Sequence, residues 1–173
     1  AALQQDAHLP VATTFMGKGS VDETHPLSIG VVGNTMGVGA RSRDLRHMVT
    51  EADVVLLVGN RTNQNGTDSW TLYPKNAQYI HIDIDPQEIG RNYEALRLTG
   101  DAKLTLAALR EAVLKLDLAA RKTARAKLEA EIGKAVSAWR TLVAGVTSRD
   151  GGPVRPERVA AELDKRMPTD AIM

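Results

Sequence analysis

The chain has 173 residues, of which 43% are hydrophobic, and it carries 22 Lys and Arg residues against 21 Asp and Glu residues. This length accommodates one domain of ordinary size with additional helix, and the balanced charge argues against a nucleic-acid-binding protein. The absence of cysteine excludes disulfides, thiolate metal sites and cysteine nucleophiles, and it fits a cytoplasmic location. No hydrophobic run reaches the ~18 to 20 residues of a membrane-spanning helix, so no membrane partner is expected.

The first half of the chain alternates between predicted strands and helices. Residues 1–9 are typical of the last turns of a helix, and residues 10–14 are predicted to form a short strand that leads into a Gly-containing loop. Hydrophobic residues at helical spacing predict a helix within residues 38–52. Residues 53–60 contain five consecutive large aliphatic residues and end near Gly59, which predicts a strand buried on both faces.

The same alternation continues to residue 116. Residues 79–85 are predicted to form a strand, a proline-initiated helical turn follows at 86–93, and residues 94–101 contain a last strand. Asp101 is a predicted N-cap for a helix that ends at residue 116. Strands separated by helices in this order indicate an α/β fold, with a doubly wound parallel sheet.

The remaining residues have a different pattern. Hydrophobic residues recur every three or four positions from 117 to about 148, which predicts a long amphipathic helix. A Gly- and Pro-containing linker, a short helix and the beginning of a strand at 168–173 follow. Both ends of the sequence therefore look cut within an element, and we expect the chain to be a piece of a longer polypeptide.

A cluster of polar residues lies in the predicted strand at 79–85. His81, Asp83 and Asp85 alternate with isoleucines, so their side chains share one face of a strand. Three interpretations are open: a metal site, an acid–base pair of aspartates roughly 7 Å apart, or hydrogen-bond acceptors for a nucleotide at the carboxyl end of the strand. In a sheet covered on both sides, His81 is predicted to be a buried structural residue.

Two other segments are candidate phosphate-binding elements. The Gly-rich segment 30–41 could hold phosphate on backbone N–H groups, with Asn34 or Thr35 as a cap and Arg41 nearby, or it could be a tight turn. Arg61 follows the most hydrophobic strand, which places it either against a diphosphate or on the surface. Lys18 and His25 follow the first strand and have the same two interpretations.

Four segments together resemble a known family. Residues 10–34, 51–61, 77–93 and 100–109 resemble, in order and spacing, the central domain of thiamine-diphosphate-dependent enzymes of the acetohydroxyacid synthase (acetolactate synthase) type. The resemblance implies a Rossmann-like central domain at 1–116 that lacks its first strand, and a connector helix at 117–150. It also implies that residues 151–173 begin a C-terminal diphosphate-binding domain.

The resemblance also predicts where the chemistry resides. The catalytic glutamate of the family belongs to an N-terminal pyrimidine-binding domain, and the Gly-Asp-Gly motif that holds metal and diphosphate belongs to the C-terminal domain. Neither occurs here, so no catalytic or metal-binding residue is predicted in this chain. Thiamine diphosphate and Mg²⁺ are expected in the full-length protein, a transferase or lyase that acts on 2-oxo acids and forms a homo-oligomer with its flanking domains in place.

In this family the central domain binds FAD or ADP, or serves only as a scaffold that bridges its neighbours. The positions that match its nucleotide site are Thr14, Phe15, Met16, Lys18, Gly59, Asn60, Arg61, Asp83, Ile84 and Asp85. Acetohydroxyacid synthases usually continue Gly-Ala-Arg-Phe-Asp-Asp-Arg after the strand that matches residues 53–60. This chain continues Gly59-Asn60-Arg61-Thr62-Asn63-Gln64-Asn65, without the acidic residues and the second Arg, which looks more like glyoxylate carboligase and other carboligases. A free-standing module that binds FAD, ADP or NAD is the alternative function.

Overall fold

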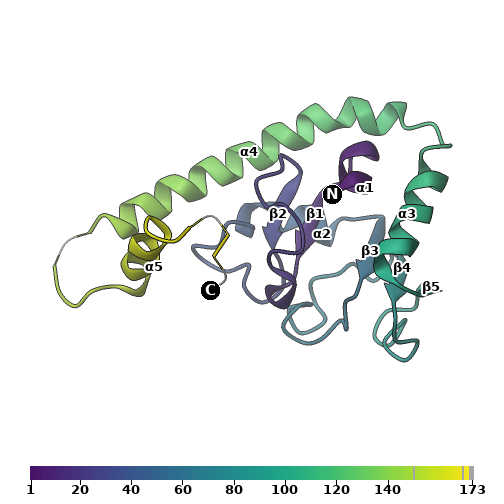
Figure 1. Cartoon of the computed structure of the whole chain (residues 1–173), viewed down its shortest axis with the longest axis horizontal. Coiled ribbons are helices and arrows are strands. Elements are labelled where there is room, and N and C mark those ends of the chain that lie inside the picture. The colour runs from purple at the N-terminus through teal and green to yellow at the C-terminus, as the bar shows by residue number, and fades with distance from the viewer. Residues whose placement is uncertain (150, 169, 172–173) are drawn as a thin grey trace.

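The computed structural model describes residues 1–149, 151–168, 170 and 171. In these residues the chain has the predicted α/β fold, with five strands that are parallel in every pairing and are flanked by helices (Figure 1). The strands divide between a two-stranded sheet and a three-stranded sheet whose order is β3-β4-β5. Their bounds are β1 Val11–Thr13, β2 Ser28–Val31, β3 Val54–Val58, β4 Gln78–Asp83 and β5 Leu96–Thr99.

The three-stranded sheet brings the carboxyl ends of its strands to one edge. Val58 pairs with Ile82 in the ladder between β3 and β4, and Asp83 pairs with Thr99 in the next ladder. The prediction that β3 is buried on both faces is wrong, because Val54 is 48% exposed. β3 is an end strand of its sheet, so it has a ladder partner on one side only.

The helix predicted within residues 38–52 forms only as two short segments. A 3₁₀ helix, η2, spans Arg43–Leu45, and α2 spans His47–Thr50. Gly39 has a left-handed φ of 84°, and the Ser42 hydroxyl donates to the carbonyl of Val31 at the end of β2. These local constraints keep the segment 38–42 out of a helix.

Side chains cover the outer edge of β2. Gly30 has a φ of 93°, and the register between β1 and β2 shifts next to it, which marks a bulge. Arg41 Nη2 donates to the carbonyls of Glu23 (2.8 Å) and Ser28 (3.3 Å), while Ser42 donates to the carbonyl of Val31. Backbone acceptors at this edge are therefore already occupied, which disfavours pairing with another strand.

Helices flank the sheets and extend beyond them. They are α1 Ala2–Asp6, η1 Phe15–Gly17, α3 Ala102–Val113, α4 Ala119–Thr147 and α5 Pro156–Asp164. The predicted cap of α3 is confirmed, because the Asp101 carboxylate accepts from the N–H of Leu104 at 2.9 Å. The proline-initiated segment at 86–93 contains hydrogen-bonded turns and no helix. The strand predicted at 168–173 includes residues 169, 172 and 173, which lie outside the described part of the chain.

The long helix α4 runs along one side of the molecule and contributes to its core (Figure 1). Ile132 and Ala135 of α4 are buried in the hydrophobic cluster that β2, β3 and β4 also supply. The imidazole of His47 lies 2.7 Å from the carboxylate of Glu131, which adds a polar contact between α2 and α4. Within the described residues, no helix is both long enough and hydrophobic enough to span a membrane.

Candidate functional site

The turn that follows β3 presents an open backbone beside a free cation. Gly59 has a φ of 57°, and a Cβ added there would have no atom within 4 Å. Asn60 closes the turn, because its side-chain carbonyl accepts from the N–H of Thr62 at 2.8 Å. Arg61 is exposed and makes no hydrogen bond or ion pair with any residue that the structure describes. A guanidinium beside accessible backbone is an arrangement that can bind phosphate.

The end of β4 lies next along the same sheet edge. The Asp83 carboxylate accepts from the N–H of Asp85 at 3.0 Å, and the Asp85 carboxylate accepts from the N–H of Gln87 at 2.9 Å. Each aspartate thus uses one oxygen to shape its own turn and keeps the other without a partner among the described residues. Ile84 lies between them and is 73% exposed, so it offers a hydrophobic surface at the end of the strand.

His81 is buried beneath this edge, as predicted for a structural residue. His81 is only 1% exposed, and its Nδ1 accepts a hydrogen bond from the N–H of Gly90 at 3.3 Å. The ring proton is therefore assigned to Nε2. Burial lowers the pKa of His81, and the Asp83 carboxylate opposes that effect. No group of three or more His, Cys, Asp or Glu side chains that could hold a metal ion occurs within the described ranges.

The buried His81 predicts a pH dependence of stability. An unfolded histidine binds a proton below its ordinary pKa of 6.5, whereas folded His81 has a lower pKa and stays neutral. The unfolded state then holds more protons, so the free energy of unfolding is expected to fall as the pH drops from 6.5 through the folded pKa. Urea denaturation between pH 5 and pH 8 measures this change in the free energy of unfolding, with the ionic strength of the buffers held about constant.

A matched pair of variants assigns this pH dependence. His81→Gln is expected to flatten the decrease below pH 6.5, while His25→Gln, in an exposed loop, leaves it in place. An unchanged slope in His81→Gln would show that other groups cause the dependence.

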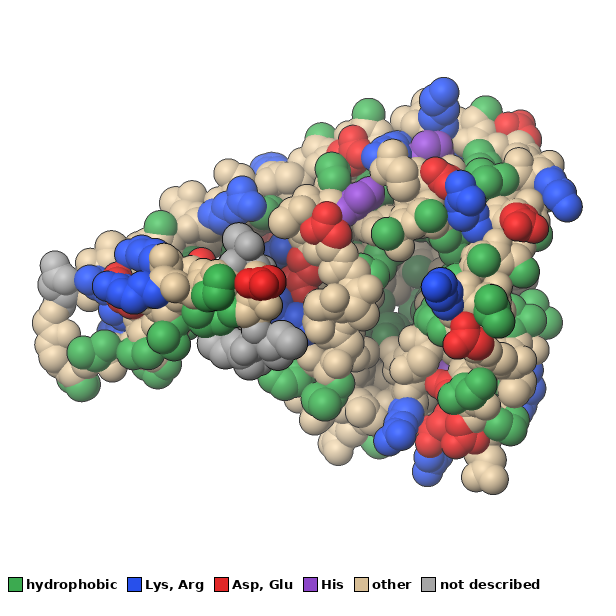
Figure 2. All heavy atoms as spheres, viewed as in Figure 1, with side chains coloured by type: hydrophobic (Ala, Val, Ile, Leu, Met, Phe, Trp, Pro, Cys, Tyr) green, Lys and Arg blue, Asp and Glu red, His purple; other side chains and the backbone are tan. Residues whose placement is uncertain are grey.

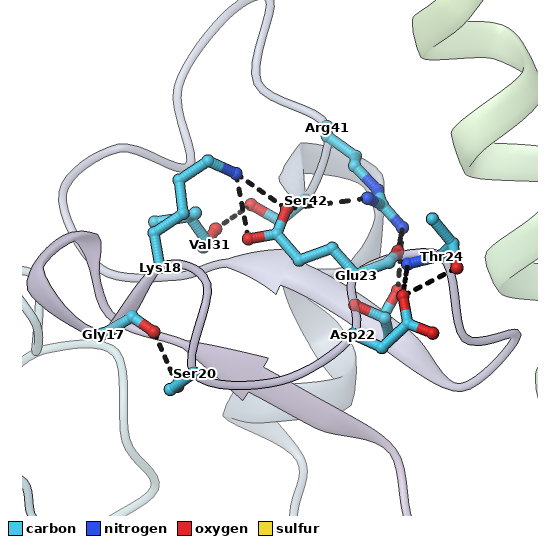
Figure 3. Close-up of polar contacts among 10 residues, drawn as sticks. Gly17, Lys18, Ser20, Asp22, Glu23, Thr24, Val31, Arg41 and Ser42 are labelled. Atoms are coloured by element: carbon cyan, nitrogen blue, oxygen red, sulfur yellow. Dashed lines mark hydrogen bonds and ion pairs between the residues drawn. The ribbon is translucent and has the colours of Figure 1, made fainter. Parts of the chain in front are cut away.

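The loop after β1 holds the other four predicted site residues. The Thr14 hydroxyl accepts from the N–H of Gly17 at 3.2 Å and caps η1. Phe15 and Met16 follow and are exposed, Met16 to 85%. The ammonium of Lys18 donates to both carboxylate oxygens of Glu23, at 2.8 and 2.9 Å (Figure 3). The charge of Lys18 is thus already compensated, in contrast to that of Arg61.

A loop packs against the carboxyl ends of β1 and β2. The N–H of Asn34 donates to the carbonyl of Asn65 at 2.8 Å, and a Cβ on Gly33 would lie 2.3 Å from that same carbonyl oxygen. A Cβ on Gly66 would lie 3.0 Å from Thr14. Gly33, in the Gly-rich segment 30–41, therefore allows its backbone to pack closely against the backbone of Asn65 and Gly66. Asn65 and Gly66 are not among the predicted site residues, although Asn-Gly is a turn signal.

Three tyrosines that pack against one another are also not among the predicted site residues. Tyr93 contacts Tyr73 at a ring-centroid distance of 5.5 Å and Tyr79 at 4.9 Å. Burial raises the pKa of Tyr73 and of Tyr79 to about 12, and the Tyr79 hydroxyl donates to the carbonyl of Pro74 at 2.6 Å. These phenols stay protonated at neutral pH, so the tyrosine cluster is neutral.

Comparisons with known proteins give the chain its family. The family model described as "Thiamine pyrophosphate enzyme, central domain" matches residues 1–109. Probable acetolactate synthase large subunits are 33% identical over 90% of this chain in Methanococcus aeolicus and 34% identical over 93% in Methanocaldococcus jannaschii, with 26% and 25% of those relatives covered. Glyoxylate carboligase of Escherichia coli O157:H7 is 33% identical over 98% of this chain and 28% of its own length.

The chain thus spans about a quarter of the length of the curated relatives it matches. The match extends over the β1 loop, the Gly59 turn and the Asp83–Asp85 edge, which all lie within residues 1–109. The predicted resemblance is confirmed: the chain belongs to the family of thiamine pyrophosphate enzyme central domains.

Proposed function

We propose that the chain is the non-catalytic central domain of a larger thiamine-diphosphate-dependent carboligase or decarboxylase that acts on 2-oxo acids. The observation that carries this proposal is the family match over residues 1–109, together with relatives named acetolactate synthase and glyoxylate carboligase. Thiamine diphosphate supplies the reactive carbon in such enzymes, and no residue of this chain is assigned to hold it or Mg²⁺. The free-standing binding module is less favoured, because the matched relatives are much longer than the chain.

In this proposal the chain contains three functional parts. Residues 1–116 form the central domain and residues 151–173 begin the diphosphate-binding domain. Residues 117–150 are the helical connector between the two. β1 and β3 are end strands of their sheets, and the space-filling view has a hollow lined by hydrophobic side chains in the middle of the molecule (Figure 2). These features support one further parallel strand that joins the two sheets. A homo-oligomeric, cytoplasmic enzyme is part of the same proposal.

The edge formed by β3 and β4 is the proposed FAD or ADP site. The residues there fit such a group: Arg61 would bind the diphosphate beside the open backbone of Gly59, and Asn60 would hold that turn. The free oxygens of Asp83 and Asp85 would accept from ribose hydroxyls or the adenine amine, and Ile84 would contact the purine. Thr14, Phe15, Met16 and Lys18 would contact the rest of a dinucleotide.

A comparison of two proteins tests the assignment. The full-length polypeptide is expected to turn over 2-oxo acids only when thiamine diphosphate and Mg²⁺ are added, and replacement of a glutamate in its first domain should abolish turnover. The 173-residue chain is expected to be inactive under the same conditions. Turnover by the 173-residue chain alone, or cofactor-independent turnover by the full-length polypeptide, would contradict the proposal.

A further inference from the structure

A small pocket of about 140 Å³ lies between the loop at 39–44 and helix α4. Its walls include Arg41, Arg43, Asp44, Ala135, Trp139 and Leu142. None of these residues belongs to the Gly59 turn or to the Asp83–Asp85 edge. The pocket is therefore a separate feature that the proposed nucleotide site does not use.

The wall formed by α4 is hydrophobic and fixed in place. Trp139 donates its indole N–H to the carbonyl of Gly39 at 3.1 Å, so the ring is held against the loop. Ala135 is buried in the core cluster, and Leu142 is 50% exposed at the same pocket. A ligand with a short hydrophobic body would cover Leu142 and contact the indole ring.

The wall formed by the loop is cationic. The side chain of Arg43 is exposed and has no hydrogen bond or ion pair with any described residue. Arg41 directs Nη2 at the carbonyls of Glu23 and Ser28, with Nη1 3.8 Å from the Glu23 carboxylate (Figure 3). Its Nε is buried and has no acceptor among the described residues. An anion in the pocket would supply a counter-charge to Arg43 and would lie near the partly compensated Arg41.

Asp44 also lines the pocket and limits the charge of an acceptable ligand. Two arginines and one aspartate line the pocket, and the Glu23 carboxylate lies 3.8 Å from Arg41, so Arg43 is the lining cation without a counter-charge of its own. A group with one negative charge matches this balance, whereas a phosphate would place more charge beside Asp44. The volume of about 140 Å³ is too small for a nucleotide, since pockets for larger ligands measure roughly 300 to 1,000 Å³.

We propose that this pocket binds a small monocarboxylate with a short hydrophobic body. The carboxylate lies against Arg43 and Arg41, and the hydrophobic body lies against Trp139 and Leu142. Because one wall is the loop after β2 and the other is α4, a bound ligand bridges the sheet region and the long helix.

Titration of the 173-residue chain by NMR tests this proposal. The chain has two tryptophans, so the indole N–H of Trp139 reports on the pocket while that of Trp70 serves as an internal reference. Butanoate is expected to shift the Trp139 signal saturably, with a Kd on the order of 1 mM for a ligand of so few atoms. Butanamide lacks the charge and acetate lacks the hydrophobic body, so both should bind about tenfold more weakly or worse.

Three variants locate the binding. Arg43→Gln removes the free cation and is expected to weaken butanoate binding by about tenfold. Leu142→Glu places a carboxylate at the rim and should abolish binding. Arg140→Gln is the matched control, because Arg140 is exposed on α4, has no partner among the described residues and does not line the pocket. Circular dichroism and urea denaturation of each variant confirm that it is folded.

Several results would overturn the proposal. These are equal binding of butanoate and butanamide, tighter binding of inorganic phosphate than of butanoate, and a Trp139 signal that does not saturate. Equal weakening by Arg140→Gln and Arg43→Gln would also overturn it. None of these readouts depends on the enzyme reaction, so the pocket and the proposed function can fail independently.

Discussion

Replacing Gly33 with alanine is expected to lower the free energy of unfolding by about 2 to 5 kcal/mol. Gly33 has a φ of 108°, which side chains rarely adopt, and the new Cβ would lie 2.3 Å from the carbonyl oxygen of Asn65. The atom in its way belongs to backbone, so the loop at 63–66 must move. That movement would break the bond from the Asn34 N–H to the Asn65 carbonyl. Chemical denaturation with urea measures the loss.

Gly19→Ala separates the two causes of this loss. Gly19 has a similar φ of 85°, but a Cβ there would meet nothing within 4 Å. Its substitution should therefore cost only about 1 to 2 kcal/mol for the left-handed backbone. Equal losses at Gly19 and Gly33 would show that the contact with Asn65 contributes nothing.

Replacing Arg61 with alanine is expected to weaken ADP or FAD binding by the full-length polypeptide by about 1.5 to 3 kcal/mol, roughly 10- to 150-fold. The reason is that Arg61 is exposed, has no partner among the described residues and follows directly on the open Gly59 turn. Its guanidinium loses no existing ion pair when it binds a diphosphate. Isothermal titration calorimetry measures the change in Kd.

Lys18→Ala is the informative comparison for Arg61. Both residues match the nucleotide site of the family, but the Lys18 ammonium is bound to Glu23 at 2.8 Å. Its removal is expected to change the Kd by less than about threefold, the scale of an exposed charge. Arg140→Ala on α4 controls for net charge. If Arg61→Ala binds ADP and FAD as tightly as the unchanged protein, Arg61 does not belong to the site.

The pattern of hydrophobic residues predicted most of the fold. Alternation predicted β4, although the strand ends at Asp83 and leaves Asp85 in the turn that follows, and the helical spacing after Asp101 and after residue 117 predicted α3 and α4. The helix predicted within 38–52 failed, although Leu45 and Val49 are buried as its stripe required. Gly39 and the bond from Ser42 to Val31 outweighed the helical pattern, because both act on backbone conformation that periodicity does not describe.

The candidate site was only partly predictable. Spacing alone put Asp83 and Asp85 at the end of a strand and Arg61 after the neighbouring strand, and the family resemblance added Gly59 and Asn60 beside them. Neither the spacing nor the resemblance predicted the ion pair between Lys18 and Glu23, because that pairing depends on the path of the loop between the two residues. The pocket at Trp139 was not predicted either, since its two walls are about a hundred residues apart in the sequence.

By itself, then, the sequence determined the α/β class, most of the strands, the helices α3 and α4, and the family of this protein. Those properties follow from local periodicity and from the order of motifs along the chain. The tertiary structure decided which charges are free and which are paired, which glycines permit close backbone contact, and where α4 meets the loop after β2. These features depend on contacts between residues distant in sequence, and no local pattern of residues specifies such contacts.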